Sequence, residues 1–250
     1  MVDIVFSNDS KEAEAFDYEG EDFEAMSLAV KYYAWIVDTI KPHLGSHIVE
    51  IGAGAGVFSQ FLLDRAKPKT LTLVEPSKRN HNKLKQNIAS TKKTKVSTIN
   101  SYLKGNEKAL KDKVDTFVYI NVLEHVQDDH EEMKRVADTL QKGGKAIIFV
   151  PALRGLYSEF DKSIGHYRRY NKKRLKSLAE SAGMEVVTIR YMDMIGIFPW
   201  WLSMVIMKNK KLKPGLVRLY DTLSVPFIRT LEGIIEAPVG KNVLLVAKKR

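Results

Sequence analysis

The residues best suited to hold a ligand are three glycines at alternate positions, Gly52, Gly54 and Gly56. They follow an apolar run at residues 47–51 that is typical of a β-strand, and an apolar helical pattern begins at Val57. Glycine permits positive φ angles and lets a ligand approach the main chain without meeting a Cβ atom. The helix behind the loop offers unpaired N–H groups and a partial positive charge. This segment therefore predicts a site for a nucleotide-like cofactor at the end of a parallel strand.

Two acidic residues accompany the glycine loop. Glu50 lies two residues before the first glycine, and Glu75 ends the next apolar run, at residues 70–74. A carboxylate at the end of the second strand can accept hydrogen bonds from both hydroxyls of a ribose. The spacing departs from the dinucleotide fingerprint G-x-G-x-x-G, because Val57 stands where the third glycine belongs. A dinucleotide oxidoreductase is therefore only a distant alternative.

Four segments in a fixed order resemble the motifs of class I S-adenosylmethionine (SAM)-dependent methyltransferases. The segment V-E-I-G-A-G-A-G at residues 49–56 is similar to their first motif, and L-V-E-P-S at residues 73–77 to their acidic ribose-binding loop. Residues 115–126 resemble their fourth-strand motif, and residues 142–151 their turn and fifth strand. The resemblance implies a Rossmann-like fold with SAM as the cofactor and S-adenosylhomocysteine as the product.

The resemblance also assigns roles to the residues around the loop. The glycines would hold the methionine moiety, and Glu75 would bind the ribose. Pro76 would shape the wall near the adenine, which Ser101 and Tyr102 would flank. Asn121 would border the methionine end. The residues expected to bind the cofactor are Glu50, Gly52, Gly54, Gly56, Glu75, Pro76, Ser101, Tyr102 and Asn121.

Two histidines are candidate catalytic residues. His125 follows the fourth predicted strand, and an ordinary histidine pKa of about 6.5 suits proton removal near neutral pH. Glu124 beside it could orient the ring or simply face solvent. His166 could work with His125 or in its place. The alternative is that these histidines only hydrogen-bond the backbone or the cofactor.

A second segment, G-H-Y-R-R-Y at residues 165–170, resembles a motif of a bacterial subgroup associated with polysaccharide and lipid-linked glycan pathways. Its tyrosines offer stacking faces, and its arginines offer paired donors for phosphate or carboxylate. We therefore expect methyl transfer, at oxygen, to a small or lipid-linked acceptor that can be anionic. The alternative is a surface loop whose tyrosines pack on the sheet and whose arginines are solvated. The candidate substrate-binding residues are Tyr167, Arg168, Arg169, Tyr170 and Trp200.

We expect no metal ion. Some related O-methyltransferases, including those of the ubiquinone pathway, bind a divalent cation through E-x-x-E-H. Here Asn121 replaces the first glutamate, and a neutral amide is a weaker ligand for a hard cation.

Composition and charge limit the remaining classes of function. The 250 residues, 44% hydrophobic and 28% charged, are enough for one large domain, and the absence of cysteine excludes disulfides and thiolate chemistry. Neither a signal peptide nor an apolar run of about 20 residues is visible, so we expect a cytoplasmic protein that could work at the inner face of the membrane. A net charge of +10 in basic clusters keeps an RNA methyltransferase open, although aromatic residues are not interleaved with the basic runs. A non-catalytic SAM-binding protein at the membrane is a third interpretation.

The alternation of strands and helices predicts an α/β fold, with a seven-stranded, mostly parallel sheet covered by helices on both faces. An N-terminal helix is expected over residues 22–40. A later helix is expected to begin after Asn171, which caps it, and to run to Ala182, where Gly183 ends it. Residues 1–20 are expected to form a flexible arm, and residues 21–250 one domain. The predicted strands cover residues 47–51, 70–74, 96–99, 114–120, 145–151, 185–191 and 242–248.

Residues 193–240 interrupt this alternation and are predicted to form a helical insertion or cap between the last two strands. An apolar run at residues 194–207 contains Trp200 and Trp201, and lysines follow at residues 208–213. The apolar run is too short to cross a bilayer. It could be a membrane contact, a lid, a dimer interface or part of the core of a helical cap.

Overall fold

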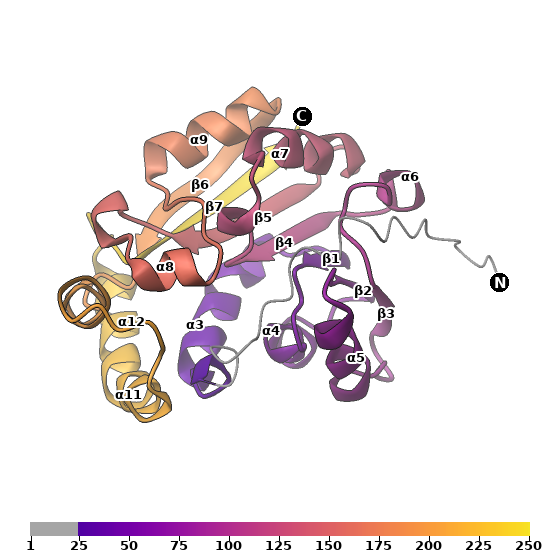
Figure 1. Ribbon diagram of the computed structural model, residues 1–250. Helices are drawn as coiled ribbons and strands as arrows, with labels where there is room; N and C mark the ends of the chain where they lie inside the picture. Colours follow the sequence, from indigo (N-terminus) through magenta and orange to yellow (C-terminus); the bar gives the residue numbers. More distant parts are fainter. Residues whose placement is uncertain (1–24) are drawn as a thin grey trace.

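The computed structural model describes residues 25–250 and shows one sheet between two layers of helices (Figure 1). The arm expected at residues 1–20 lies outside the described residues. Seven strands follow the order β3-β2-β1-β4-β5-β7-β6. Their bounds are β1 (His47–Ile51), β2 (Thr70–Val74), β3 (Lys95–Ile99), β4 (Thr116–Ile120), β5 (Lys145–Pro151), β6 (Met184–Met192) and β7 (Asn242–Lys249).

Strands β1 to β5 pair in parallel, and β7 lies antiparallel between β5 and β6. This arrangement confirms the predicted Rossmann-like, mostly parallel sheet. Strand β1 lies between β2 and β4, so the chain turns in opposite directions on its two sides. Folds of this type bind ligands outside the carboxyl ends of the strands at that point.

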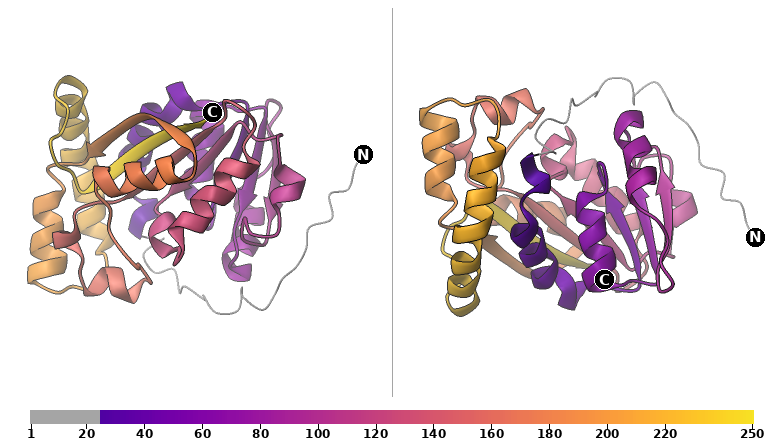
Figure 2. Two further views of the ribbon diagram at one scale, coloured as in Figure 1. Left: turned by 90° about the horizontal axis from the view of Figure 1, so that it is seen from above. Right: turned by 90° about the horizontal axis from the view of Figure 1, so that it is seen from below.

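Two helical layers cover the sheet (Figure 2). Helices α7 (Asp129–Thr139) and α9 (Lys172–Ser181) pack on one face, and α3 (Val30–Ile40), α4 (Val57–Phe61) and α5 (Lys78–Asn87) on the other. Each layer closes its own apolar core against β-branched and aromatic residues of the central strands. The shorter elements are η1 (Lys41–His43), η2 (Leu62–Ala66), α6 (Glu107–Leu110), η3 (Leu123–His125), η4 (Arg154–Leu156) and α8 (Glu159–Ser163).

Local signals explain where several helices begin and end. The side chain of Asn171 accepts a hydrogen bond from Arg174 N at 2.8 Å, and Gly183 has a φ of 78°, which confirms the predicted limits of α9. The predicted helix over residues 22–40 is continuous only from Val30 within its described part. A distant carboxylate marks this start, because Asp221 accepts hydrogen bonds from the N–H groups of Lys31 and Tyr32 at 3.0 and 2.8 Å.

The segment between β6 and β7 is helical, as predicted. It contains α10 (Ile197–Trp200), η5 (Trp201–Ile206), α11 (Pro214–Leu219), η6 (Tyr220–Ser224) and α12 (Val225–Ile234). The buried carboxylate of Asp221 attaches it to α3, and that of Glu232 joins the start of the segment to α12. Glu232 accepts hydrogen bonds from the N–H groups of Asp193 and Met194 at 3.3 and 2.8 Å. Within residues 25–250, no helix has both the length and the apolar character needed to span a bilayer.

Candidate cofactor and acceptor site

A pocket of about 730 Å³ opens at the carboxyl ends of the central strands. Its lining includes the last residue of each of four strands, Ile51 of β1, Val74 of β2, Ile120 of β4 and Pro151 of β5. The pocket therefore lies where the order of the strands predicts a ligand. The predicted site residues that line it are Glu50, Gly52, Glu75, Pro76, Ser101, Tyr102, Asn121, His125, His166, Tyr167, Arg169 and Trp200.

The glycine loop has the backbone shape that its sequence predicts. Gly52, Gly54 and Gly56 all have positive φ angles, of 69°, 56° and 90°. A Cβ atom on Gly52 would lie 2.5 Å from Cγ2 of Val122, and one on Gly56 would lie 2.6 Å from Cγ1 of Ile88. Only Gly52 of the three lines the pocket; Gly54 and Gly56 shape the loop and its packing instead of the pocket wall.

Glu75 is held at the pocket wall by backbone donors. Its Oε2 accepts a hydrogen bond from Gly54 N at 2.8 Å, and its Oε1 accepts one from Ser77 N at 2.9 Å. Burial raises the pKa of Glu75, and these two backbone hydrogen bonds oppose the rise. The side chain of Asn80 also hydrogen-bonds this carboxylate, and the remaining lone-pair capacity of the two oxygens still allows a hydrogen bond from a ligand hydroxyl. The sequence did not reveal that Asn100 fixes this loop, by donating to the carbonyls of Glu75 and Pro76 at 2.9 Å each.

Glu50 and Asn121 lie on either side of the loop. Burial raises the pKa of Glu50 to about 8. The hydrogen bond that Ser59 Oγ donates to Glu50 Oε2 at 2.7 Å lowers the pKa, but by less than burial raises it. Glu50 is therefore mostly protonated at neutral pH without a ligand, and a cationic group beside it would favour its charged form. Asn121 has a φ of 52°, a conformation that asparagine tolerates, and its N–H bonds Phe149 O at 2.8 Å.

The lining of the pocket also contains a histidine that an acidic residue orients. His166 Nδ1 lies 2.9 Å from Oδ1 of Asp161, and Arg169 Nε and Nη2 donate to the two oxygens of the same carboxylate at 2.8 and 3.1 Å. Burial alone would raise the pKa of Asp161, but the hydrogen bond from His166 and the charge of Arg169 lower it. Asp161 is therefore a carboxylate that accepts a hydrogen bond from Nδ1 of His166, and in the neutral ring this arrangement makes Nε2 the acceptor.

Sequence reasoning missed Asp161. The available signal was the spacing Ser158-x-x-Asp161, which is typical of a capping box and does cap α8. That spacing indicates a helix start, and it says nothing about the histidine that the same carboxylate holds.

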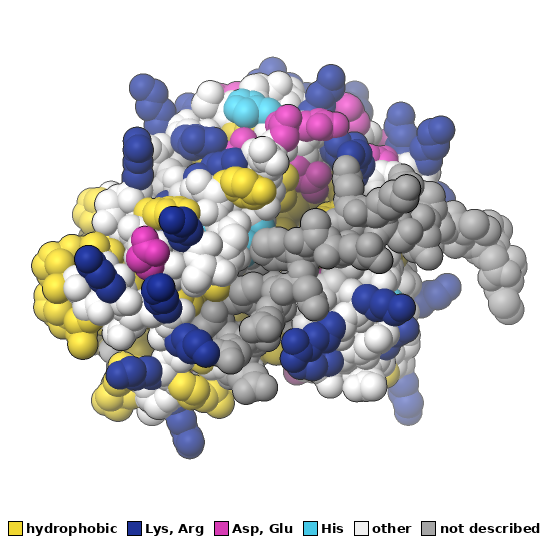
Figure 3. Space-filling view, in the orientation of Figure 1, with side chains coloured by type: hydrophobic (Ala, Val, Ile, Leu, Met, Phe, Trp, Pro, Cys, Tyr) yellow, Lys and Arg dark blue, Asp and Glu magenta, His cyan; other side chains and the backbone are white. Residues whose placement is uncertain are grey.

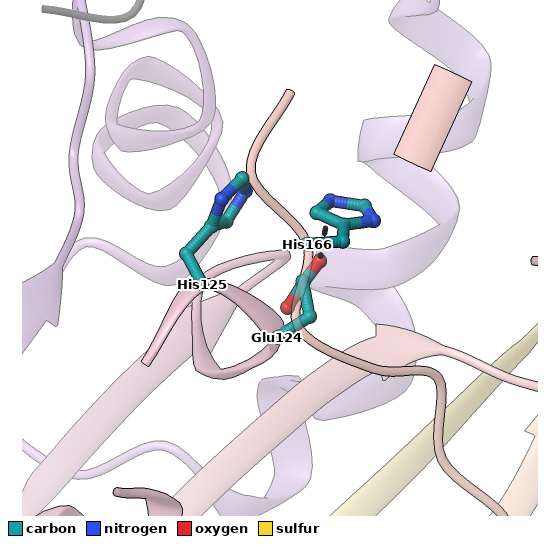
Figure 4. Close-up of side chains that lie close together, drawn as sticks. All are labelled: Glu124, His125 and His166. Carbon is teal, nitrogen blue, oxygen red and sulfur yellow. Dashed lines mark ion pairs between the residues drawn. The ribbon is translucent and has the colours of Figure 1, made fainter. Parts of the chain in front are cut away.

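Glu124 and His125 lie next to His166: in Figure 4 the Glu124 carboxyl is below the His166 ring and His125 is to its left. Glu124 is fully buried, so the prediction that it could face solvent is wrong; its Oε1 lies 3.7 Å from His166 Nε2. Among the described residues, neither of its carboxylate oxygens has a hydrogen-bond partner, and burial raises its pKa to about 7. The rings of His125 and His166 are 4.6 Å apart, and burial, then the charge of His166, lower the pKa of His125 to about 3. His125 is therefore a neutral and weakly basic group.

The same three residues are the set most able to hold a metal ion within residues 25–250. The ligand atoms of Glu124, His125 and His166 all lie within 4.8 Å of one another. The expectation that no metal ion binds remains a prediction.

Two predicted substrate-binding residues have structural roles instead. Arg168 donates to the carbonyls of Val126 and Gln127 at 2.8 and 2.7 Å, and its guanidinium lies 3.0 Å from Asp129. The hydroxyl of Tyr170, a buried residue, donates to the same Asp129 carboxylate at 2.9 Å. Neither residue belongs to the lining that the described residues form, because both side chains turn towards Asp129 beneath the loop.

The other three predicted substrate-binding residues do line the pocket. Arg169 is committed to Asp161, and its guanidinium lies 4.9 Å from the centre of the Trp200 ring. Tyr167 is 54% exposed at the pocket edge. Lys241, which the sequence did not single out, also lines the pocket, with its Nζ 2.7 Å from Asp193.

Comparisons with known proteins agree with this architecture. A family model described as a methyltransferase domain matches residues 20–189, and no curated protein matches the sequence. A SAM-dependent methyltransferase from Archaeoglobus fulgidus has a TM-score of 0.60 and 18% identity, over 92% of this chain and 98% of its own. One from Thermotoga maritima, titled a possible histamine N-methyltransferase, has a TM-score of 0.59 and 20% identity, over 93% and 96%. A putative methyltransferase from Haloferax volcanii, solved with the activator Trm112, has a TM-score of 0.58 and 13% identity, over 95% of each chain.

These structural likenesses show the fold, and the family model covers more than half of the sequence. Membership of the bacterial subgroup with the G-H-Y-R-R-Y loop remains a prediction. The chain belongs to the methyltransferase domain family and has the seven-stranded fold of class I SAM-dependent methyltransferases.

Proposed function

We propose that this protein methylates an oxygen atom of a small or lipid-linked acceptor, with His166 as the general base. The observation that carries the proposal is the pair formed by Asp161 and His166 in the lining of the pocket, where an Nδ1 proton held by Asp161 would leave Nε2 of a neutral ring to accept a proton. An oxygen acceptor such as a hydroxyl must lose its proton during transfer, and a positioned base accelerates that loss.

The cofactor half of the pocket is assigned from its chemistry. Glu75 has fixed carboxylate oxygens with lone pairs to spare, which suits the two ribose hydroxyls. Glu50 and Asn121 border the region proposed for the methionine end, where a buried carboxyl would balance an ammonium group. Pro76, Ser101 and Tyr102 form the wall proposed for the adenine. SAM, when bound, supplies an electrophilic methyl group on a sulfonium centre.

Positioning accounts for most of the proposed rate enhancement. An acceptor atom that is held in line with the methyl group reacts in an effectively unimolecular step. His166 Nε2 accepts the hydroxyl proton, and its Nδ1 proton stays on the hydrogen bond to Asp161. The resulting imidazolium then lies between two carboxyl groups, Asp161 at 2.9 Å and Glu124 at 3.7 Å. We assign His125 a packing role against His166, because its low pKa makes it the weaker base.

Two experiments test the proposal. Isothermal titration with SAM and with S-adenosylhomocysteine should show binding, and no binding at millimolar ligand would refute the cofactor assignment. Extracts of the source cells should then be incubated with the protein and SAM labelled in the methyl group. Label in small-molecule or lipid fractions, on an oxygen atom identified by NMR, supports the acceptor class. Label in RNA, or on nitrogen or carbon, overturns it.

A further inference from the structure

The exposed apolar side chains of this protein are concentrated in one segment. Of the seventeen large hydrophobic residues that are exposed among residues 25–250, twelve belong to the insertion at residues 193–240. Figure 3 shows hydrophobic side chains gathered on the side of the molecule where Figure 1 places α11 and α12. Scattered exposed apolar residues are normal, but a contiguous patch marks a surface that binds something.

The patch has a regular helical pattern. Leu216, Leu219, Leu223 and Phe227 follow one another at intervals of three or four residues along α11, η6 and α12, and each is more than half exposed. We call these four residues the outer stripe. The opposite face of the same helices carries the residues that pack on the domain, including Val225 and Ile228. The outer stripe is therefore a second apolar face, not required for the core of the domain.

A neighbouring helix adds to this surface. Phe198, Trp201 and Ile206, on α10 and η5, are 64%, 42% and 53% exposed. Tryptophan and phenylalanine beside basic side chains are typical of elements that lie at a membrane–water interface.

Charge distinguishes an anionic partner from other occupants. The loop between η5 and α11 carries three exposed lysines, Lys208, Lys210 and Lys213. Of the four acidic residues in the insertion, Asp193, Asp221 and Glu232 are buried, and the fourth, Glu236, pairs with Lys172 at 2.8 Å. An apolar face bordered by cations with no unpaired exposed acid complements a bilayer that contains anionic lipid.

The surface also reaches the pocket. Trp200 of α10 and Leu212 of the basic loop line it, and the Trp200 ring lies 5.4 Å from that of Phe160 on α8. The insertion thus forms one wall of the site as well as the exposed apolar surface, so an acceptor held in a bilayer beneath the outer stripe would lie close to the pocket.

We propose that the insertion docks the protein on an anionic membrane through the outer stripe and its lysines, and that the acceptor is therefore a lipid-linked molecule reached from that membrane. The second half of this inference rests on the function proposed above.

The test is flotation with vesicles of phosphatidylcholine, with and without phosphatidylglycerol. The first variant, Leu216→Ser/Leu219→Ser/Leu223→Ser/Phe227→Ser, removes the outer stripe. The second, Lys208→Ala/Lys210→Ala/Lys213→Ala, removes the lysines. The matched control, Lys92→Ala/Lys93→Ala/Lys95→Ala, removes the same charge from exposed residues at and before β3, the opposite edge strand.

The wild type and the control should float with the anionic vesicles and only weakly with phosphatidylcholine alone. Both test variants should lose about tenfold or more in partitioning, because apolar contact and charge each contribute to interfacial binding. A wild type that does not float, or a control that loses as much as the lysine variant, overturns the proposal. If light scattering instead finds a dimer that the stripe variant dissociates, and vesicles do not bind, the surface is an interface between two copies.

Affinity for S-adenosylhomocysteine separates this inference from the proposed function. It should be unchanged in all three variants, which also shows that they fold. If the wild type does not bind the cofactor, the proposed function fails, whereas its flotation still reports on docking. If docking holds but the methyl label of the wild type stays out of the lipid fraction, the assignment of a lipid-linked acceptor is wrong.

Discussion

Replacement of Asp161 by asparagine should destabilise the protein far more than the same change at an exposed carboxylate. Asp161 is fully buried and accepts hydrogen bonds from Arg169, His166 and Ser158. The Arg169 side chain is 1% exposed, so Asp161→Asn leaves a buried guanidinium without its counter-charge. Breaking a buried pair from one side costs about 3–5 kcal/mol. That is a large part of the roughly 5–15 kcal/mol that stabilises a typical domain.

Asp38 provides the matched control. It also meets two arginines, Arg65 at 2.8 Å and Arg229 at 3.0 Å, but the side chains of these residues are between 27% and 46% exposed. Because solvent screens such pairs, Asp38→Asn should cost only about 0–1 kcal/mol. Urea unfolding of both variants at neutral pH gives the two free energies. Equal losses, or a loss below about 1 kcal/mol for Asp161→Asn, would refute the argument.

The dependence of stability on acid pH provides an independent check of the charge on Asp161. The pKa of Asp161 is lowered in the folded protein, so the unfolded state binds more protons as the pH falls. Its stabilising contribution is present above the ordinary aspartate pKa of about 3.9 and is lost as the pH falls through the lower folded value. Asp161→Asn should lack this part of the acid sensitivity. NMR of the histidine ring nitrogens should find the Nδ1 proton on His166 in the wild type, and a mixture of tautomers in the variant.

Three further predictions concern the pocket and its surroundings. Glu75→Gln should weaken S-adenosylhomocysteine binding by about tenfold or more in calorimetry, because a charge-assisted hydrogen bond contributes roughly 1.5–3 kcal/mol; an unchanged affinity contradicts the ribose assignment. The same affinity should rise as the pH increases towards about 8, where Glu50 ionises, and Glu50→Gln should abolish that dependence. Tyr170→Phe should lower the free energy of unfolding by about 1 kcal/mol, because it removes the hydrogen bond to Asp129. It should leave cofactor affinity unchanged, because Tyr170 does not line the pocket.

The central strands and the glycine loop could be predicted from sequence because their signals are local. The apolar runs at residues 47–51 and 70–74 are enough to predict β1 and β2. The three glycines permit the positive φ angles that the loop adopts, whatever the later chain does. The end of β2 likewise places Glu75 at the pocket without knowledge of any distant residue.

The acceptor side was less predictable because its contacts join distant segments. The motif G-H-Y-R-R-Y shows which residues are polar, but not that Tyr170 is buried or that Arg168 turns to Asp129. The role of Asp161 depends on how α8 packs beside His166, and spacing along the chain does not report that packing. In the insertion, the sequence indicated helical structure but not which apolar face would be left exposed.

The most direct test of the central claim is a crystal structure of the protein with S-adenosylhomocysteine. We predict the ribose hydroxyls on the Glu75 carboxylate, the methionine end between Glu50 and Asn121, and the sulfur facing the cavity that His166 borders. The account would be contradicted by a ligand bound elsewhere, or by a pocket that protein side chains fill at saturating ligand.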